Sequence, residues 1–546
     1  MMKNKFFKLA SIALSSIAMF SAVACGGEVV GGELPDDKPT ISMIYYKGGY
    51  GEEYMKKTVE NFNNRAKAGE YDFYVTAMAD EGVTGTVETQ INQKDNGADV
   101  VDVAICNSIM LQEWALLGHA TDITDVFKTE VTASNFEGGK ATIEKKIDQR
   151  LGSRICYDGK YYGLPLQGGV TGLLYNTSLY KAVTGLDTPP QTMKEVWDVL
   201  DKVEKYTTNT NGSTADDVYA FIYAGNAIGY YQYFTYCGMA QYLGMDEFYN
   251  LYDLHGVMDK FQADGYKDAY ENTFEGIVKV GQPMYPTKND PKFHMTTATS
   301  HTLALNAFAD GRAVFTPCGD WTYNEIAAAD ASMAKDVSIM PIPLVCDPET
   351  GLVTAVATPS SKVQDENDYF KVERAKVDPA FIPTEDATAE YIYFEKYSYS
   401  LGADVFGIIP NGSKNIDKAK KFLAYLASDE ALQMFTKYAG SRLPYDYEVP
   451  TDIYNGLSDF SKTCVDLLDN VQSIYMASTY KGVSYGIVNM FLNTTGNMHG
   501  ELLVWGSGTT PSSIASGLYS NIKTKLTKEM AKVDQSIQIF EDLAKL

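Results

Sequence analysis

The chain has 546 residues, of which 45% are hydrophobic and 21% charged, so it can bury the cores of two or more globular domains. Its 46 lysines and arginines stand against 70 aspartates and glutamates, which gives a formal net charge of −24. This acidic balance argues against nucleic-acid binding and against a polybasic membrane-surface role, because both need an excess of positive charge.

The N-terminus has the pattern of an export signal. Three lysines precede an apolar run over 9–20, which is too short to cross a bilayer comfortably. Small residues then lead to Cys25, and the arrangement resembles a bacterial lipobox, although Ala22 stands where the motif prefers leucine. We expect 1–24 to be a lipoprotein signal peptide, Cys25 to carry the lipid, and 25–38 to be the anchor's flexible tether. The alternative is an ordinary signal peptide followed by an incidental cysteine.

Strand and helix patterns alternate after the tether. In chain order they predict a strand over 39–46, a helix over 53–67, a strand over 71–77, a helix over 84–93 and a strand over 98–105. Such alternation indicates parallel β-α-β units, in which ligands bind beyond the carboxyl ends of the strands. The loops at 47–51 and 106–108 are therefore expected to face the ligand.

Three further helices and one irregular segment are predicted later in the chain. Apolar stripes predict helices over 417–427 and from Asp429 onward. After Pro511, apolar residues spaced mostly by four predict a long helix that packs on a lobe, whereas a partner-binding coiled coil would need heptad spacing. The stretch 345–396 is acidic, contains prolines and lacks a clear period, so we expect an insertion or a long loop there.

Four stretches occur in an order that a known family shares. They are the strand, loop and helix over 44–62; DGKYYGLP from Asp158, followed by LYNTSLY from Leu174 and PPQTMKE from Pro189; AFADGRAVF from Ala307, followed by Gly319-Asp320-Trp321; and PNGSKN from Pro410, followed by GSRLP from Gly440. Together they resemble bacterial extracellular solute-binding proteins of the maltose-binding type, which serve ABC importers.

The resemblance implies an α/β fold of the periplasmic-binding-protein type, with two lobes, a hinge and a ligand cleft between the lobes. The expected boundaries, in chain order, are 39–167 for the first part of lobe 1, 168–343 for the first part of lobe 2, 344–446 for the return to lobe 1 with an insertion at about 345–396, and 447–546 for the C-terminal helices of lobe 2. Crossings between the lobes are expected near 166–169, Pro343 and 444–449, and closure would be a hinge motion.

The same resemblance implies a function. The protein would capture a carbohydrate, either a monosaccharide or an oligosaccharide, at the extracellular face of the cell membrane. It would then deliver the sugar to the permease subunits of an ABC importer. We expect a lipid-anchored monomer that needs no cofactor or metal and does not bind nucleic acid.

A sugar site needs aromatic faces for stacking and polar side chains for the hydroxyls. Trp321 leads the candidates, because it is one of only four tryptophans and lies in the stretch similar to the family's stacking tryptophan. Tyr231 and Tyr233 belong to an aromatic cluster over 230–236, of which one or two members should face the cleft. The ligand-binding candidates are Trp321, Asp320, Tyr46, Gly48, Asn107, Ser108, Tyr231, Tyr233 and Arg442.

Most of these candidates also have a purely structural interpretation. Trp321 could pack in the core, and Asp320 could cap a helix. Asn107 and Ser108 could serve ordinary turn chemistry. Arg442 either reaches the ligand or staples its lobe, and the sequence leaves both interpretations open.

The sequence contains little that indicates catalysis. The five histidines form no HExxH motif, and neither GxSxG nor a complete P-loop occurs, so we expect a binding protein and not an enzyme. A surface carbohydrate-active enzyme with a carboxylate pair is the rival class. A peptide, a phosphorylated polyol or a metal chelate could also replace the sugar in the same fold. The six cysteines after Cys25 form no CxxC pair, and their disulfide state stays open.

The lipobox leads to a direct prediction. Replacement of Cys25 by serine should release the protein from the membrane fraction, because a serine hydroxyl cannot receive the thioether-linked lipid. Fractionation of cells that express the wild type and the Cys25→Ser variant, followed by immunoblotting, measures this. A variant that stays with the membranes would show that the lipobox interpretation is wrong.

Overall fold

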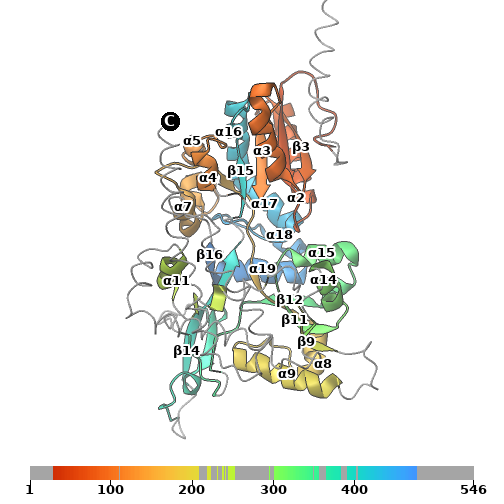
Figure 1. Ribbon diagram of the computed structural model, residues 1–546, viewed down its shortest axis with the longest axis vertical. Helices are drawn as coiled ribbons and strands as arrows, with labels where there is room; N and C mark the ends of the chain where they lie inside the picture. Colours follow the sequence, from red (N-terminus) through yellow and green to blue (C-terminus); the bar gives the residue numbers. More distant parts are fainter. Residues whose placement is uncertain are drawn as a thin grey trace, which may run out of the picture. The chain divides into compact units, whose positions relative to one another are not determined.

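The computed structural model describes the following residues: 29–107, 109, 111–207, 218–222, 230, 236–238, 240–241, 244–252, 294–295, 301–347, 350–355, 365–382, 390–400 and 404–475. They belong to two compact units, each of which is described by itself (Figure 1). Unit 1 contains the described residues up to Gly168 and those of 404–456, and unit 2 contains those of 169–400 and 457–475. The predicted signal peptide, Cys25 and the helix after Pro511 lie outside the described residues.

Unit 1 is built on a mixed sheet with the strand order β1-β3-β2-β4-β15-β7 among the described residues. The strands are β1 (Val29–Val30), β2 (Thr40–Tyr46), β3 (Tyr74–Asp80), β4 (Val103–Asn107), β7 (Leu164–Pro165) and β15 (Val405–Ile408). β2 runs parallel to β3 and β4, whereas β15 is antiparallel to β4 and β7. Since β2 is buried from Ile41 to Tyr45, its sequence is almost continuously apolar.

The described helices of unit 1 are α2 (Glu53–Lys67), α3 (Val83–Gln93), α4 (Leu111–Leu116), α5 (Thr124–Phe127), α6 (Ile143–Lys146), α7 (Gln149–Ile155), α16 (Ile416–Leu426), α17 (Asp429–Ala439) and α18 (Thr451–Gly456). Among them, α2, α3, α16 and α17 lie close to predicted positions, whereas α4 to α7 and α18 were not predicted. α2 has the predicted bounds, and its Phe62 ring contacts the rings of Phe422 and Tyr425 on α16. These aromatic contacts tie two helices together that are far apart in the sequence.

Two strands of unit 1 begin later than predicted. β3 spans Tyr74–Asp80 and not 71–77, and β4 spans Val103–Asn107 and not 98–105. For β3, the reason is its pairing with β2. Thr40 at the start of β2 lies opposite Tyr74, so residues before Tyr74 have no partner residue on β2. Tyr71 and Phe73 instead pack on the Phe62 ring.

Unit 2 holds a second mixed sheet, with the order β10-β9-β11-β8-β12 among the described residues. Its strands are β8 (Thr171–Asn176), β9 (Tyr219–Ile222), β10 (His294–Met295), β11 (Ala313–Gly319) and β12 (Val337–Met340). Its described helices are α8 (Thr177–Thr184), α9 (Met193–Thr207), α11 (Met245–Tyr252), α14 (His301–Ala309), α15 (Thr322–Ala329) and α19 (Asp459–Asn470). β11 is parallel to β9 and antiparallel to β8. No helix in the described part of the chain has the length and apolar surface needed to cross a bilayer.

The segment expected to be an insertion or long loop contains regular strands. β13 (Tyr369–Glu373) pairs antiparallel with β14 (Tyr391–Ser400), which pairs parallel with β16 (Val471–Tyr475). This ladder belongs to unit 2, so the described residues of 344–400 lie in unit 2 and not in the return to lobe 1. The sequence could not indicate this, because β14 gains its strand partner β16 from a segment about 70 residues further on.

The positions where the described chain changes units follow from these contacts. It leaves unit 1 after Gly168, which lies in the stretch 166–169, and it leaves unit 1 again after Gly456 and not near 447. The segment around 447 is held in unit 1 by main-chain and side-chain bonds: the Tyr445 hydroxyl donates to the Pro165 carbonyl at 2.8 Å, and the Asp446 N–H donates to the Lys146 carbonyl at 2.7 Å.

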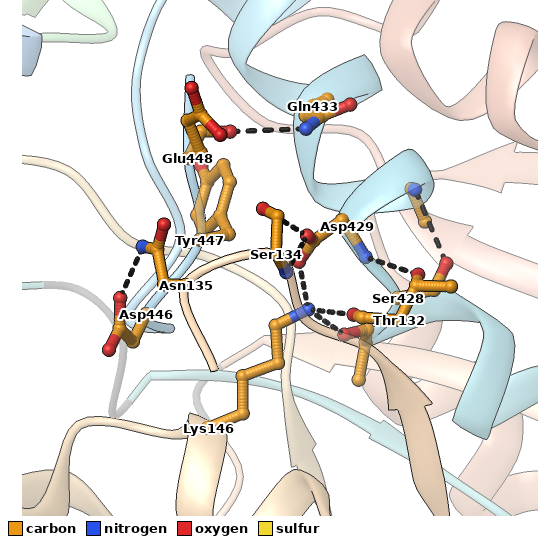
Figure 2. A network of polar contacts seen from close by, with 12 residues as sticks. Thr132, Ser134, Asn135, Lys146, Ser428, Asp429, Gln433, Asp446, Tyr447 and Glu448 are labelled. Atoms are coloured by element: carbon orange, nitrogen blue, oxygen red, sulfur yellow. Dashed lines mark hydrogen bonds and ion pairs between the residues drawn. The ribbon is translucent and has the colours of Figure 1, made fainter. Parts of the chain in front are cut away.

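Unit 1 also contains a fully buried ammonium group, shown in Figure 2. Lys146 ends α6, just after the hairpin of β5 (Glu130–Thr132) and β6 (Lys140–Thr142), and it is 0% exposed. Its Nζ donates to the carbonyls of Thr132 and Ala427 at 2.7 and 3.0 Å and to Asp429 Oδ1 at 2.5 Å. All three donor positions of the ammonium group are therefore used.

The partner carboxylate is equally well satisfied. Asp429 Oδ2 accepts from the Ser134 N–H at 2.6 Å and from the Ser134 hydroxyl at 2.7 Å (Figure 2). Burial alone would raise the pKa of Asp429, but the hydrogen bonds from Lys146 and Ser134 outweigh burial and lower the pKa. The pair thus joins the 130–146 region to the start of α17.

We predict that Lys146→Met lowers the free energy of unfolding by about 3–5 kcal/mol, because it leaves a buried carboxylate without its cation. Urea denaturation measures this. The folded-state pKa of Asp429 is depressed, so its contribution is present above the unfolded pKa of about 3.9 and is lost as the pH falls through the lower folded value. The stability difference between the wild type and Asp429→Asn should accordingly narrow below about pH 4.

Lys414→Met is the matched control. Lys414 pairs with Asp99 at 2.7 Å on the surface, where water screens the pair, so this change should affect unfolding far less. Equal effects of the two lysine substitutions would contradict a stabilising role for the buried pair.

Candidate functional site

In unit 1, three parallel strands end at polar or aromatic residues. β2 ends at Tyr46, β3 at Asp80 and β4 at Asn107. The Thr84 hydroxyl donates to the main-chain carbonyl of Asn107 at 2.7 Å, and the Thr86 hydroxyl donates to Asp80 Oδ2 at 2.8 Å. The start of α3 therefore holds two of these strand ends in place.

The loop after β2 is shaped by a close approach of one ring to a main chain. The half-buried Tyr46 ring lies over Gly48, where a Cβ atom would come within 2.7 Å of Tyr46 Cε1. Only glycine fits there without moving the ring. The Tyr50 hydroxyl donates to the Gly168 carbonyl at 2.9 Å, and the Gly51 N–H donates to the Gly48 carbonyl at 3.0 Å. The loop thus presents Tyr46 from a braced main chain.

Arg442 makes structural contacts within unit 1. Its Nη2 donates to the Tyr447 carbonyl at 2.8 Å, and its guanidinium carbon lies 4.9 Å from the centre of the Tyr447 ring. These contacts are those of a brace for the 442–447 turn, which is one of the two interpretations that the sequence allows.

In unit 2, Asp320 joins the end of β11 to the segment that enters β8. Its N–H donates to the Val170 carbonyl at 3.0 Å, and its Oδ2 accepts from the Val170 N–H at 3.1 Å. Asp320 is only 3% exposed, and these two bonds hold the end of β11 against the segment before β8.

Trp321 follows at the first position of the turn into α15. It is 6% exposed, and its ring lies directly over Gly319, where any side chain would overlap the ring. The Tyr230 ring lies 6.1 Å from the Trp321 ring, centre to centre, at an angle of 41°. Trp321 is therefore largely buried, and its aromatic neighbour Tyr230 comes from a segment of unit 2 that is far away in the sequence.

The Tyr230 ring is in turn stacked on a histidine. The His301 ring lies 4.2 Å from the Tyr230 ring with an interplanar angle of 6°, and His301 Nε2 lies 3.0 Å from Glu325 Oε2. We call Trp321, Tyr230, His301 and Glu325 the β11-end cluster, because they gather beyond the carboxyl end of β11. Figure 1 shows the two helices that supply His301 and Glu325, α14 and α15, next to each other.

The sequence indicated this cluster only in part. Tyr230 belongs to the aromatic cluster over 230–236, whereas Tyr236 is buried against the Tyr399 ring. Glu325 could have been found, since it lies four residues after Trp321 on a helix. His301 carries no such signal, because only tertiary structure brings it to Glu325. Ser108, Tyr231 and Tyr233 lie outside the described residues.

Neither metal binding nor thiol chemistry is supported in the described part of the chain. No group of three or more His, Cys, Asp or Glu side chains is placed there to hold a metal ion. The described cysteines form no disulfide, and burial raises the pKa of Cys106, Cys237 and Cys318 to about 12. These thiols stay protonated at neutral pH and are packing groups.

Comparisons with known proteins agree on one family and one fold. A family described as bacterial extracellular solute-binding protein matches residues 57–455. No curated protein matches the sequence at a significant level. The bacterial solute receptor AcbH, reported to prefer β-D-galactopyranose exclusively, is 15% identical with a TM-score of 0.56, over 90% of this chain and 99% of its own.

Two further solved structures share the fold. The GacH receptor of Streptomyces glaucescens, solved unliganded and with acarbose, is 14% identical with a TM-score of 0.54, over 90% of this chain and 99% of its own. The maltose/maltodextrin-binding domain MalE from Bdellovibrio bacteriovorus, bound to maltotriose, is 15% identical with a TM-score of 0.51, over 90% of this chain and 100% of its own. At these identities the matches establish the periplasmic-binding-protein fold.

Proposed function

The chain belongs to the family of bacterial extracellular solute-binding proteins, and we propose that it captures a carbohydrate outside the cell and delivers it to an ABC importer. As a member of this family, the protein is a solute receptor and not an enzyme. The carbohydrate, its delivery to the importer and the lipid anchor on Cys25 are the parts that we propose.

The β11-end cluster is the observation that carries the choice of a sugar. A sugar ring has a weakly apolar C–H face and a rim of hydroxyl groups, so its site needs aromatic rings next to hydrogen-bonding groups. The rings of Trp321 and Tyr230 and the partly exposed pair of His301 and Glu325 meet this requirement within one small region of unit 2. The cluster also lies beyond a strand's carboxyl end, where α/β folds bind their ligands.

Two other observations support the same choice. The solved receptors of the same fold named above were studied with acarbose, β-D-galactopyranose and maltotriose. In unit 1, the strand-end residues Tyr46 and Asn107 offer an aromatic ring and an amide, both of which are suited to sugars and neither of which is charged. Asp320 and Arg442 make the structural bonds described above, so we assign them to holding the site and not to the sugar itself.

The lipid on Cys25 would hold the receptor at the extracellular face of the membrane, with 25–38 as its tether. Such a lipid anchor would keep the receptor close to the permease subunits. The receptor would act as a monomer. It would need no cofactor, because capture and release of a sugar make and break no covalent bond.

A thermal-shift screen of the mature protein against monosaccharides and oligosaccharides tests the proposal. A sugar at about 100 times its dissociation constant should stabilise the protein by roughly 2.7 kcal/mol and raise the melting temperature. Recovery of the sugar unchanged, checked by chromatography, is also expected. No shift with any sugar, together with a shift for a peptide or a phosphorylated polyol, would reject the carbohydrate assignment.

We predict that Trp321→Ala weakens binding of the sugar found in that screen by about 2–4 kcal/mol, because it removes a central aromatic anchor. Isothermal titration calorimetry measures this. Trp321→Phe keeps an aromatic ring and should weaken binding less. A graded loss of affinity over the two variants separates the loss of the anchor from misfolding of one variant.

Trp114→Ala is the matched control for Trp321→Ala. Trp114 is a similarly buried tryptophan of unit 1 that packs on His119, so its loss should lower stability but leave sugar affinity nearly unchanged. Unchanged affinity in Trp321→Ala would remove Trp321 from the site.

A further inference from the structure

The β11-end cluster contains a histidine–carboxylate pair whose part in ligand choice the proposed function does not define. His301 begins α14, and Glu325 lies one turn into α15, where its N–H donates to the Trp321 carbonyl at 3.3 Å. The two side chains meet at 3.0 Å between His301 Nε2 and Glu325 Oε2. Because α14 and α15 pack against each other, this contact joins two helices at the edge of the aromatic rings.

The pair is more open to solvent than the Trp321 ring beside it. The side chains of His301 and Glu325 are 23% and 33% exposed, whereas Trp321 is 6% exposed. The buried pair of Lys146 and Asp429 uses its polar atoms inside unit 1, but this pair has polar atoms that a solute can reach. It therefore differs from the Lys146–Asp429 pair in both place and exposure.

The geometry determines what the carboxylate can offer to a ligand. A carboxylate oxygen only accepts hydrogen bonds, so His301 Nε2 carries the proton in this contact. Glu325 has about four lone-pair positions, of which the contact with His301 occupies one. The remaining positions suit hydroxyl or amine donors, and an anionic group near them would be repelled.

His301 fixes this carboxylate in place. Its ring is stacked face to face on the Tyr230 ring, and its Nε2 holds Glu325, so it links the stacking surface to the acceptor. In this arrangement Glu325 is placed to contact a ligand, and His301 is placed to orient Glu325.

We propose that the His301–Glu325 pair sets the charge class of the ligand, so that the site takes sugars without an anionic group and rejects those that carry a carboxylate or a phosphate. This rests on the proposed function, that is, on a sugar being the ligand. It goes further, because it states which sugars do not bind and which two residues exclude them.

Calorimetry with two matched series tests the proposal: glucose, glucosamine and glucuronate, and galactose, galactosamine and galacturonate. In the wild type, the acid of the better-bound series should bind at least about tenfold more weakly than its neutral sugar, because like charges are brought together. Glu325→Gln keeps the size of the side chain and removes the charge. This variant should reduce the ratio of the neutral-sugar affinity to the acid affinity to about twofold or less.

Two histidine variants separate positioning from packing. His301→Phe keeps a flat ring on Tyr230 but removes the donor to Glu325, whereas His301→Gln keeps a donor of similar reach. The neutral-to-acid affinity ratio should fall several-fold in His301→Phe and recover in His301→Gln. General damage to the fold would weaken the binding of both sugars together and would leave the neutral-to-acid affinity ratio unchanged.

Two control variants change residues of unit 1 that do not belong to the cluster. Glu60→Gln removes an exposed carboxylate of α2, and His119→Gln removes a histidine that packs on Trp114, so both should keep the wild-type ratio. A wild type that binds the acid as well as the neutral sugar, or a Glu325→Gln variant with an unchanged ratio, would overturn the proposal while leaving sugar capture standing. Binding of none of the six probes, together with no shift for any oligosaccharide in the thermal-shift screen, would reject the sugar assignment of the cluster and the proposal with it. If only an oligosaccharide binds, it and its uronic-acid counterpart replace the six probes in the same comparison.

Discussion

Two hydrogen bonds between Asp320 and Val170 fix the end of β11 against the start of the β8 segment, and the β11-end cluster depends on them. One bond joins the two main chains and the other joins the Val170 N–H to the Asp320 carboxylate, so together they set the position of the next residue, Trp321, within narrow limits. Gly319 completes the constraint, because only a residue without a side chain lets the tryptophan ring lie over the strand end. Once Trp321 is placed, α15 begins, and its next turn brings Glu325 to His301.

Charge serves two different purposes in the two units. Lys146 and Asp429 are buried and bond to each other and to the main chain, so their charges act within the fold of unit 1 (Figure 2). His301 and Glu325 are partly exposed beside aromatic rings, where a charge can select among ligands. The degree of burial, and not the kind of residue, separates the stabilising pair from the pair that we assign to specificity.

The candidate residues divide according to how local their evidence is. Tyr46, Asp80 and Asn107 end strands, and a strand end follows from the pattern of the strand itself. Trp321 could be chosen from its neighbours Gly319 and Asp320. The roles of Arg442 and Asp320 could not, because their partners Tyr447 and Val170 are known only once the chain has folded. His301 was missed for the same reason.

The sequence by itself determined the family, the α/β class and the helices with strong periodicity, such as α2 at Glu53–Lys67, because a helix satisfies its main chain locally. Tertiary structure decided the register of β3 and β4, the strands β13 and β14 in a stretch without a period, and the unit to which 344–400 belongs. A strand makes its main-chain hydrogen bonds with partner strands elsewhere in the chain, so its bounds and its unit depend on those partners. The β11-end cluster follows the same rule, because it joins side chains from three separate segments of unit 2.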